Sequence, residues 1–190
     1  YKKKHLGTLG KIGVLSFNGN KTITCGNGGV ILTSSKKIAK YVRHITTTAK
    51  VKHKYEYIHD DFGFNLRLSN INAAIGCAQL EKLKIIINAK RKNFLKYYNY
   101  FKSNNNVEIV QEPKNSKSNY WLIALKLIKN SNQKNYILKK LHNNNIKCRP
   151  LWKPLHTLKM FKNFPKDNLS NTNKLYRIII NLPSSPSLKI

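Results

Sequence analysis

Long hydrophobic runs are absent from the 190-residue sequence. Its most apolar stretches, such as 85–87 and 178–180, are far shorter than the roughly 18 apolar residues that a membrane-spanning helix needs. The sequence therefore excludes a chain that crosses a membrane as a helix. No apolar signal core follows Tyr1, so we expect no targeting peptide, and the lack of an initial Met suggests that the sequence starts at a cut.

Cysteine is scarce. Cys25, Cys77 and Cys148 are an odd number, widely spaced, and lack the paired spacing of zinc ligands. We therefore expect free thiols in a reducing cytoplasm, with no disulfide framework and no metal site.

Acidic residues are also scarce: seven Asp and Glu stand against 36 Lys and Arg, a formal charge of +29. Such an excess normally favours nucleic-acid binding, because cations neutralise phosphates. Arg, which binds phosphates and guanine edges bidentately, is rare here, and Lys is spread along the whole chain together with Asn and Ile. A- and T-rich codons specify all three residues, so we interpret the charge mainly as codon bias. A basic nucleic-acid-binding module remains the alternative.

The first hundred residues combine strands and helices. The hydrophobic content of 41% excludes a wholly disordered chain. Apolar patterns predict strands at 10–16 and 29–33 and a helix at 36–44, capped by Ser34 or Ser35. The irregular pattern of residues 46–69 predicts a long loop, and long loops often carry functional residues. Helical spacing of apolar residues predicts one or two long helices from 70 to 101.

The remaining residues predict a second, smaller α/β unit. The predicted strands are 107–110, 120–128, 146–149 and 178–182, and the predicted helices are 133–142 and 171–176. Alternating strands and helices indicate an α/β architecture, which we divide into domains 1–100 and 101–190.

One segment places chemistry-bearing residues in a turn between two strands. It runs Ser16-Phe17-Asn18-Gly19-Asn20-Lys21 and continues to Gly28-Gly29. A lysine amine in such a turn can form a Schiff base, and glycines allow close approach of the backbone to a flat cofactor. On spacing alone, a lone turn lysine is usually a solvated surface residue, and Ser16 is as well explained as a turn cap.

Several separated motifs resemble one enzyme family. They are Gly7-Thr8-Leu9-Gly10, the Ser16–Gly29 segment, Gly63-Phe64-Asn65-Leu66-Arg67 with the helix after it, and Arg149-Pro150-Leu151-Trp152-Lys153-Pro154-Leu155-His156. Together they resemble the DegT/DnrJ-type nucleotide-sugar aminotransferases, which use pyridoxal 5'-phosphate (PLP) and have the aspartate-aminotransferase fold, PLP fold type I. Thr46-Thr47-Thr48-Ala49-Lys50, followed by His53, Tyr57, His59 and Asp60, is similar to the branch acting on UDP-4-keto-6-deoxy-N-acetylglucosamine-type sugars, towards bacillosamine- or legionaminic-acid-type products.

The resemblance implies roles for particular residues. Lys21 corresponds to the lysine that binds PLP covalently and moves protons, and Ser16 to the hydroxyl that hydrogen-bonds the PLP phosphate. Asn65 corresponds to the asparagine that reaches the partner's cofactor across a dimer interface, which implies a homodimer. Four residues are candidates for sugar-nucleotide contacts: His59, Arg67, Arg149 and His156.

Simpler interpretations of single residues remain open. Asn65 could be a turn residue, and Arg67 could form an ordinary surface ion pair with Asp60 or Asp61. Asn27 stands where the family usually has glycine, so we expect it to adopt a glycine-like backbone. We expect Trp152 to lie in the core rather than to serve as a stacking platform.

Family members are about twice as long, and their upstream half supplies the aspartate that keeps the PLP ring nitrogen protonated. The resemblance therefore implies that this chain is the carboxy-terminal half of an enzyme and is inactive alone. The implied reaction moves an amino group from glutamate to C4 of a nucleotide-linked 4-keto-6-deoxy sugar, in surface-polysaccharide or glycan biosynthesis. A non-catalytic remnant that keeps only the dimer-forming half is a further alternative.

Overall fold

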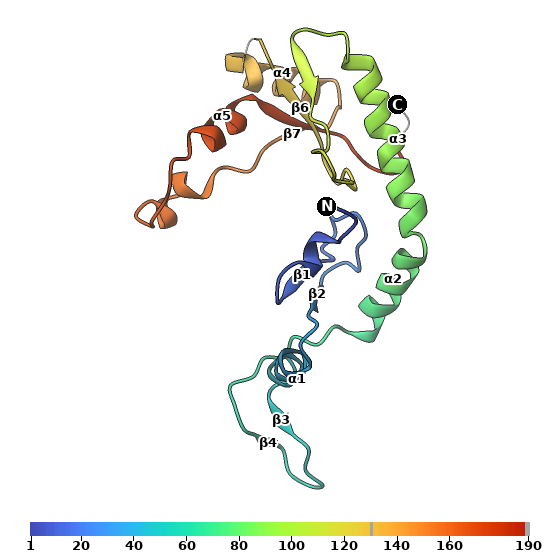
Figure 1. The fold of residues 1–190 in the computed structure, drawn as a ribbon, viewed down its shortest axis with the longest axis vertical. Coiled ribbons are helices and arrows are strands. Elements are labelled where there is room, and N and C mark those ends of the chain that lie inside the picture. The colour runs from blue at the N-terminus through green and yellow to red at the C-terminus, as the bar shows by residue number, and fades with distance from the viewer. Residues whose placement is uncertain (130, 189–190) are drawn as a thin grey trace. The chain divides into compact units, whose positions relative to one another are not determined.

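The computed structural model describes residues 1–129 and 131–188 (Figure 1). Its contacts divide the chain into two compact units. The first is Tyr1–Lys84 with Lys114–Lys117, and the second is Ile85–Pro113 with Ser118–Ile190. The domain boundary expected near residue 100 stays a prediction.

A two-stranded antiparallel sheet opens the first unit. A single 3₁₀ turn, η1 (Leu6–Thr8), precedes β1 (Gly13–Ser16), which pairs with β2 (Gly29–Leu32) from Gly13↔Leu32 to Ser16↔Gly29. Both predicted strands are confirmed, although β1 begins three residues later than expected.

Helix α1 (Lys36–Ile45) follows and confirms the predicted helix. Ser35 caps it by accepting a hydrogen bond from the Ile38 N–H at 3.3 Å, which satisfies one of the free donors of the first turn. The expectation of an irregular loop over 46–69 is wrong in part. The segment contains a short antiparallel ladder, β3 (Lys50–Val51) with β4 (Ile58–His59), whose two-residue strands are too short to show a period of two in the sequence.

Two helices occupy 70–101, as the spacing allowed. They are α2 (Asn70–Glu81), capped by Ser69, and α3 (Leu83–Phe101), and Lys82 is the residue between them.

The second unit contains a four-stranded antiparallel sheet in the order β5-β6-β8-β7. The strands are β5 (Val107–Ile109), β6 (Ile123–Leu127), β7 (Arg149–Pro150) and β8 (Ile179–Leu182). The strand predicted at 146–149 is wrong for 146–148, because only Arg149 and Pro150 pair with β8. Helices α4 (Lys134–Asn143) and α5 (Ser170–Ile178) confirm the two predicted helices. Three short 3₁₀ turns are also present, η2 (Ser131–Gln133), η3 (Leu155–Thr157) and η4 (Lys159–Phe161).

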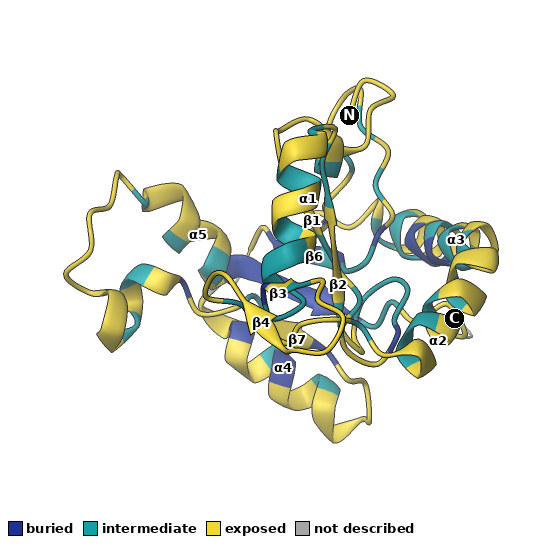
Figure 2. Ribbon diagram, turned by 90° about the horizontal axis from the view of Figure 1, so that it is seen from below, coloured by how far each residue is buried: buried dark blue, intermediate teal, exposed yellow. Residues whose placement is uncertain are grey.

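The main hydrophobic core lies in the second unit, where the dark blue segments of Figure 2 gather. β6 buries alternate residues, Ile123, Leu125 and Leu127, as a strand with one face on a core does. Phe94 of α3 stacks on Tyr120 with ring centroids 3.8 Å apart. Trp152 is not in this core: it is 65% exposed and lies beside Trp121, so the expectation of a buried Trp152 is wrong.

The first unit buries little. Within residues 1–84, all of them described, the only apolar residues classed as buried are Cys25 and Ala49. Val14 and Ile31 of the two-stranded sheet are 71% and 44% exposed. Strands with apolar side chains on both faces are typical of a sheet that is covered on both sides. Within this chain, β1 and β2 are not covered in that way.

Candidate functional site

The turn between β1 and β2 carries Ser16 and Lys21. The ladder of the two strands continues past Ser16 through the Phe17 N–H, which donates to Gly28 O at 2.9 Å. The chain then turns back, and the Lys21 N–H donates to Asn18 O at 3.0 Å. Ser16 Oγ accepts from the Asn18 N–H at 3.4 Å, which leaves its own hydroxyl hydrogen for another acceptor. The serine and the lysine therefore belong to one hydrogen-bonded turn.

The far side of this turn is attached to helix α2. Asn72 Nδ2 donates to Cys25 O at 2.5 Å, and the Cys25 side chain is fully buried. A Cβ on Gly28 would lie 2.8 Å from Leu68 Cδ1, so the backbone approaches the start of α2 closely. A fixed backbone on one side holds the Lys21 turn in place.

The expectation for Asn27 is wrong. Positive φ occurs instead at its two neighbours, Gly26 (+86°) and Gly28 (+137°), where no side chain opposes it. Asn27 uses its side chain to accept from the Gly28 N–H at 2.9 Å and keeps an ordinary backbone.

Asn65 and Arg67 lie on a segment that pairs with the residues directly after helix α1. Thr47 and Asn65 form an isolated bridge, and the Leu66 N–H donates to Thr46 O at 3.0 Å. Asn65 and Arg67 are both exposed. The pairing brings them next to residues about 20 positions earlier, which spacing in the sequence could not show.

His59 holds a bend of unusual backbone. Its Nδ1 lies 2.7 Å from Thr48 O. Thr48 and Ala49 have φ values of +66° and +50°, a region that a β-branched residue rarely adopts. His59 therefore has a positioning contact in the structure, whereas its predicted contact with a sugar nucleotide stays a prediction.

Asp60 binds a histidine rather than Arg67. His44 Nε2 lies 2.5 Å from Asp60 Oδ1, and Asp61 Oδ1 accepts from the Phe62 N–H. The ion pair of Arg67 with Asp60 or Asp61 is therefore not formed. The contact of His44 with Asp60 joins positions 16 residues apart, so no local pattern predicts it.

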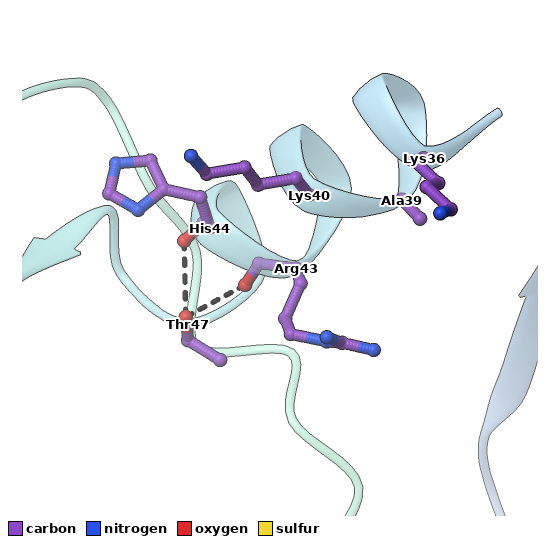
Figure 3. Close-up of a pocket in the computed structure, with 6 residues that line it drawn as sticks. All are labelled: Lys36, Ala39, Lys40, Arg43, His44 and Thr47. Atoms are coloured by element: carbon purple, nitrogen blue, oxygen red, sulfur yellow. Dashed lines mark hydrogen bonds between the residues drawn. The ribbon is translucent and has the colours of Figure 1, made fainter.

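Two clefts open beside helix α1. The first, of about 510 Å³, is lined by six residues drawn in Figure 3: Lys36, Ala39, Lys40, Arg43, His44 and Thr47. The second, of about 780 Å³, shares Arg43 and Thr47 with the first and adds Lys50, Lys52, His53 and Arg67. We call the second one the Arg43 cleft. Its cationic lining was not predicted, because only the chain path brings those residues together.

The two remaining candidates belong to the second unit. Arg149 is exposed in β7 and pairs with Asn181 of β8. His156 is half-buried in η3, and its Nε2 lies 3.0 Å from Asn173 Oδ1 on α5. Their roles as substrate contacts stay predictions.

The donor set of the β1–β2 turn fits PLP in part. Lys21 supplies a primary amine for the cofactor's aldehyde and Ser16 a hydroxyl for its phosphate, while Gly26 and Gly28 leave room beside the backbone. An acid for the ring nitrogen is not in this part of the sequence, because the first 55 residues contain no Asp or Glu. The turn can therefore bind the aldehyde and phosphate ends of the cofactor, but it does not set the charge of the ring.

Other kinds of site are not apparent in the described residues. Across 1–129 and 131–188, no group of three or more His, Cys, Asp and Glu side chains is placed to hold a metal ion. No helix in the same ranges is long and apolar enough to cross a membrane.

Known proteins show similarity along the whole chain. GDP-perosamine synthase of Escherichia coli O157:H7 is 35% identical over 190 residues, which cover 99% of this chain and 50% of that protein. The structure of Helicobacter pylori PseC, described as an aminotransferase involved in the biosynthesis of pseudoaminic acid, matches with a TM-score of 0.93 and 24% identity, over 100% of this chain and 52% of PseC. The E. coli GDP-4-keto-6-deoxy-D-mannose-3-dehydratase, solved with bound hydrated PLP, matches with a TM-score of 0.82 and 22% identity, over 97% of this chain and 52% of that one.

These likenesses confirm the predicted fold, that of part of an α/β PLP enzyme of fold type I. The chain spans about half the length of the relatives that it matches. The family model for DegT/DnrJ/EryC1/StrS aminotransferases matches residues 1–190. Since this match covers the full sequence, the chain belongs to the DegT/DnrJ/EryC1/StrS aminotransferase family.

Proposed function

We propose that the chain is part of a PLP-dependent aminotransferase that transfers an amino group to C4 of a nucleotide-linked 4-keto-6-deoxy sugar. The product would enter surface-polysaccharide or glycan biosynthesis, and glutamate would be the amino donor. Family membership supports the reaction class. The observation that carries the proposal is the β1–β2 turn, which presents the Lys21 amine and the Ser16 hydroxyl from one turn attached to α2.

Lys21 has two tasks in this proposal. Its amine binds the cofactor covalently between turnovers, and when displaced by substrate it accepts and returns the proton at the carbon that bears the amino group. PLP, when bound, supplies an electron-withdrawing ring that stabilises negative charge at that carbon. Ser16 would donate its hydroxyl hydrogen to the cofactor phosphate, because its Oγ uses only a lone pair for Asn18.

The assembly would be a homodimer in which Asn65 serves the partner's cofactor. Asn65 is exposed and its backbone is fixed by the bridge to Thr47, which is compatible with a contact outside the chain. His59, Arg67, Arg149 and His156 are proposed to contact the sugar nucleotide or the loops around it. The nucleotide stays open, since the resemblance pointed to UDP sugars and the E. coli relative is named for a GDP sugar.

A carboxylate from outside these residues would protonate the ring nitrogen. The first acidic residue of the chain is Glu56, far along the sequence from the Lys21 turn. Without that carboxylate the ring withdraws electrons less strongly. We therefore expect the 190-residue chain by itself to be inactive.

Absorbance spectroscopy of the protein with PLP tests the role of Lys21. The wild type should develop the band of lysine-bound cofactor, and Lys21→Ala should not. Lys11→Ala is the matched control, because it removes an exposed lysine ahead of β1 and should keep the band. A band that survives in Lys21→Ala would remove this lysine from the proposed role.

The two alternative functions, a nucleic-acid-binding module and a non-catalytic remnant, predict different experimental results. A nucleic-acid-binding module would bind oligonucleotides with an affinity that falls steeply with salt, by about 0.9 log units per log unit of salt for each phosphate contacted. A non-catalytic remnant would dimerise but never acquire the cofactor band. Cofactor binding that depends on Lys21, without salt-sensitive oligonucleotide binding, excludes both.

A further inference from the structure

We propose that Asn18 is a site of spontaneous deamidation, at which the backbone nitrogen of Gly19 attacks the side-chain amide. Asn-Gly dipeptides are prone to this reaction, because glycine has no Cβ to hinder the attack. The sequence contains two of them, Asn18-Gly19 and Asn27-Gly28. Both lie in the segment between β1 and β2 that carries Lys21. The consequence for the cofactor rests on the proposed function, whereas the reaction at Asn18 does not.

The reaction needs only water. A bond forms between the Gly19 nitrogen and the side-chain carbonyl carbon of Asn18, and the bond from that carbon to the side-chain nitrogen breaks. The proton of the Gly19 N–H ends on the departing ammonia, so a succinimide ring remains. Water then opens the ring at either carbonyl. Attack at the side-chain carbonyl gives aspartate, and attack at the backbone carbonyl gives isoaspartate, whose main chain runs through the side-chain carbons.

The two reacting groups lie side by side in an open turn. The Gly19 N–H donates to Asn18 Oδ1 at 2.9 Å, so the attacking nitrogen is next to the carbonyl that it attacks. Asn18 and Gly19 are both exposed, which admits water. A Cβ on Gly19 would lie no closer than 3.7 Å to its nearest neighbour, Gly26 O. The turn therefore has space to change shape as the ring closes.

Asn27-Gly28 is the same dipeptide in a tighter environment. The Gly28 N–H also donates to Asn27 Oδ1, at 2.9 Å. However, Gly28 O accepts from the Phe17 N–H in the continuation of the ladder, and a Cβ on Gly28 would lie 2.8 Å from Leu68. Asn27 O accepts from Cys25 Sγ at 3.0 Å. Ring closure at Asn27 therefore requires local opening, which makes the reaction slower by the fraction of time that the segment is open.

The charge around the turn favours the attacking form of the amide. Ring closure proceeds from the small fraction of Gly19 nitrogen that has lost its proton and is negatively charged. No Asp or Glu occurs in the first 55 residues, and Lys21 follows Gly19 by two positions. A nearby cation stabilises such an anion, whereas a carboxylate would destabilise it.

Deamidation would alter the turn that carries Lys21. Asn18 O accepts from the Lys21 N–H at 3.0 Å, and the Asn18 N–H donates to Ser16 Oγ at 3.4 Å. Isoaspartate adds one main-chain atom between Ser16 and Lys21. Either product also places a carboxylate near the hydroxyl proposed for the cofactor phosphate, and like charges repel. Under the proposed function, the modified protein therefore binds PLP more weakly.

Peptide mapping of the aged protein, compared with a fresh sample, tests the site. Trypsin separates the two dipeptides into peptides 12–21 and 22–36. In the folded chain, Asn18 should convert at least about tenfold faster than Asn27, because reaction at Asn27 requires local opening. Asn20, which precedes Lys21 rather than a glycine, is the internal control and should stay unmodified. In urea, which abolishes the ladder, Asn18 and Asn27 should react at similar rates.

Gly19→Ala tests the attack itself. The added methyl group hinders the nitrogen, and its Cβ fits because it meets nothing closer than 3.7 Å. Conversion of Asn18 should become severalfold slower. Gly10→Ala is the matched control and should leave the rate unchanged, and circular dichroism verifies that both variants fold. Absence of conversion at Asn18, equal or faster conversion of Asn27 in the folded chain, or an unchanged rate in Gly19→Ala would overturn the proposal.

The cofactor band separates this proposal from the proposed function. Aged wild type should lose the band in proportion to the conversion of Asn18, whereas aged Gly19→Ala should keep the band of its own fresh sample. A band that survives complete conversion would overturn the consequence for the cofactor. An absent band in fresh wild type would refute the proposed function, and the rates at Asn18 and Asn27 would still decide the proposal.

Discussion

At the scale of single residues, a buried lysine joins two segments of the second unit by hydrogen bonds. Lys90 of α3 is 4% exposed and its Nζ donates to Trp121 O at 3.3 Å and Ser184 O at 2.7 Å. Burial without a carboxylate lowers the pKa of this lysine. Lys90 therefore connects α3 to the segment that follows β8 through the hydrogen bond of its ammonium to Ser184 O.

Lys90→Met should lower the free energy of unfolding by about 1 to 3 kcal/mol, the cost of leaving a buried acceptor unpaired. Trp121 O keeps the hydroxyl of Ser184 as a donor at 2.7 Å, so the cost falls mainly on Ser184 O. Urea denaturation at pH 7 measures it. An unchanged or increased stability would show that the buried ammonium costs as much as its hydrogen bonds contribute.

Cys148 predicts a dependence of stability on pH. Its side chain is fully buried, and burial raises the pKa of the thiol above the ordinary value of 9.0. A raised folded pKa gives stability that is fully present below the unfolded pKa and is lost as pH rises through the folded pKa. The destabilisation caused by Cys148→Ala should therefore shrink as pH rises above 9.0. Urea denaturation of both proteins from pH 7 upward checks this, and a gap that stays constant or widens would contradict it.

At the scale of elements, two backbone segments cross closely at the bend formed by Thr48 and Ala49. A Cβ on Gly63 would lie 2.2 Å from the Thr48 carbonyl carbon, far inside van der Waals contact. Only glycine allows the two segments to pass at this distance.

Gly63→Ala should therefore displace the bend at Thr48 and Ala49 and lower the free energy of unfolding by about 1 to 3 kcal/mol, because overpacking forces the backbone to shift. Gly10→Ala is the control, since an added Cβ there would meet nothing closer than 3.5 Å. Urea denaturation of both variants provides the measurement. Unchanged stability in Gly63→Ala would show that the two segments can separate at no cost.

The sequence predicted long periodic elements and missed short ones. Apolar spacing that extends over several turns predicts a helix at 36–44 and one or two helices over 70–101, and the structure has helices at 36–45, 70–81 and 83–101. Strands β3, β4 and β7 have two residues each, and no period can be recognised in two residues. Trp152, expected in the core, is 65% exposed, and its ring lies beside that of Trp121.

The same distinction applies to the candidate site: residues that are close in the sequence can be predicted together, and residues that are far apart cannot. Ser16 and Lys21 are five residues apart, so a local pattern places them in one turn. The Arg43 cleft joins a helix to residues more than twenty positions later through the bridge of Thr47 with Asn65, and a contact of that kind leaves no local signal. The expectation for Asn27 failed because two flanking glycines take up the positive φ.

At the scale of the whole molecule, the two units differ in what they bury. The second has a continuous core over β6 and β8, whereas residues 1–84 bury only Cys25 and Ala49 among apolar residues and leave many large apolar side chains exposed. The chain also spans about half the length of its relatives. An unequal burial of apolar surface implies an unequal local stability.

Hydrogen exchange of the 190-residue chain should show this difference. Amides of β6 and β8 should exchange slowest, near the rate set by global unfolding, and amides of β1 and β2 should exchange much faster. Mass spectrometry of peptides from the two sheets gives both rates in one experiment. Equal protection of both sheets would show that the first unit is stable without further covering.

The central claim is that the amine of Lys21 binds the cofactor, and its most direct test is to locate that bond. The protein is incubated with PLP, reduced with borohydride so that the attachment becomes permanent, digested and analysed by peptide mass spectrometry. The account predicts a single dominant phosphopyridoxyl group on the peptide that contains Lys21, despite the many other lysines of this chain. A label distributed over surface lysines, or concentrated on any lysine other than Lys21, would contradict it.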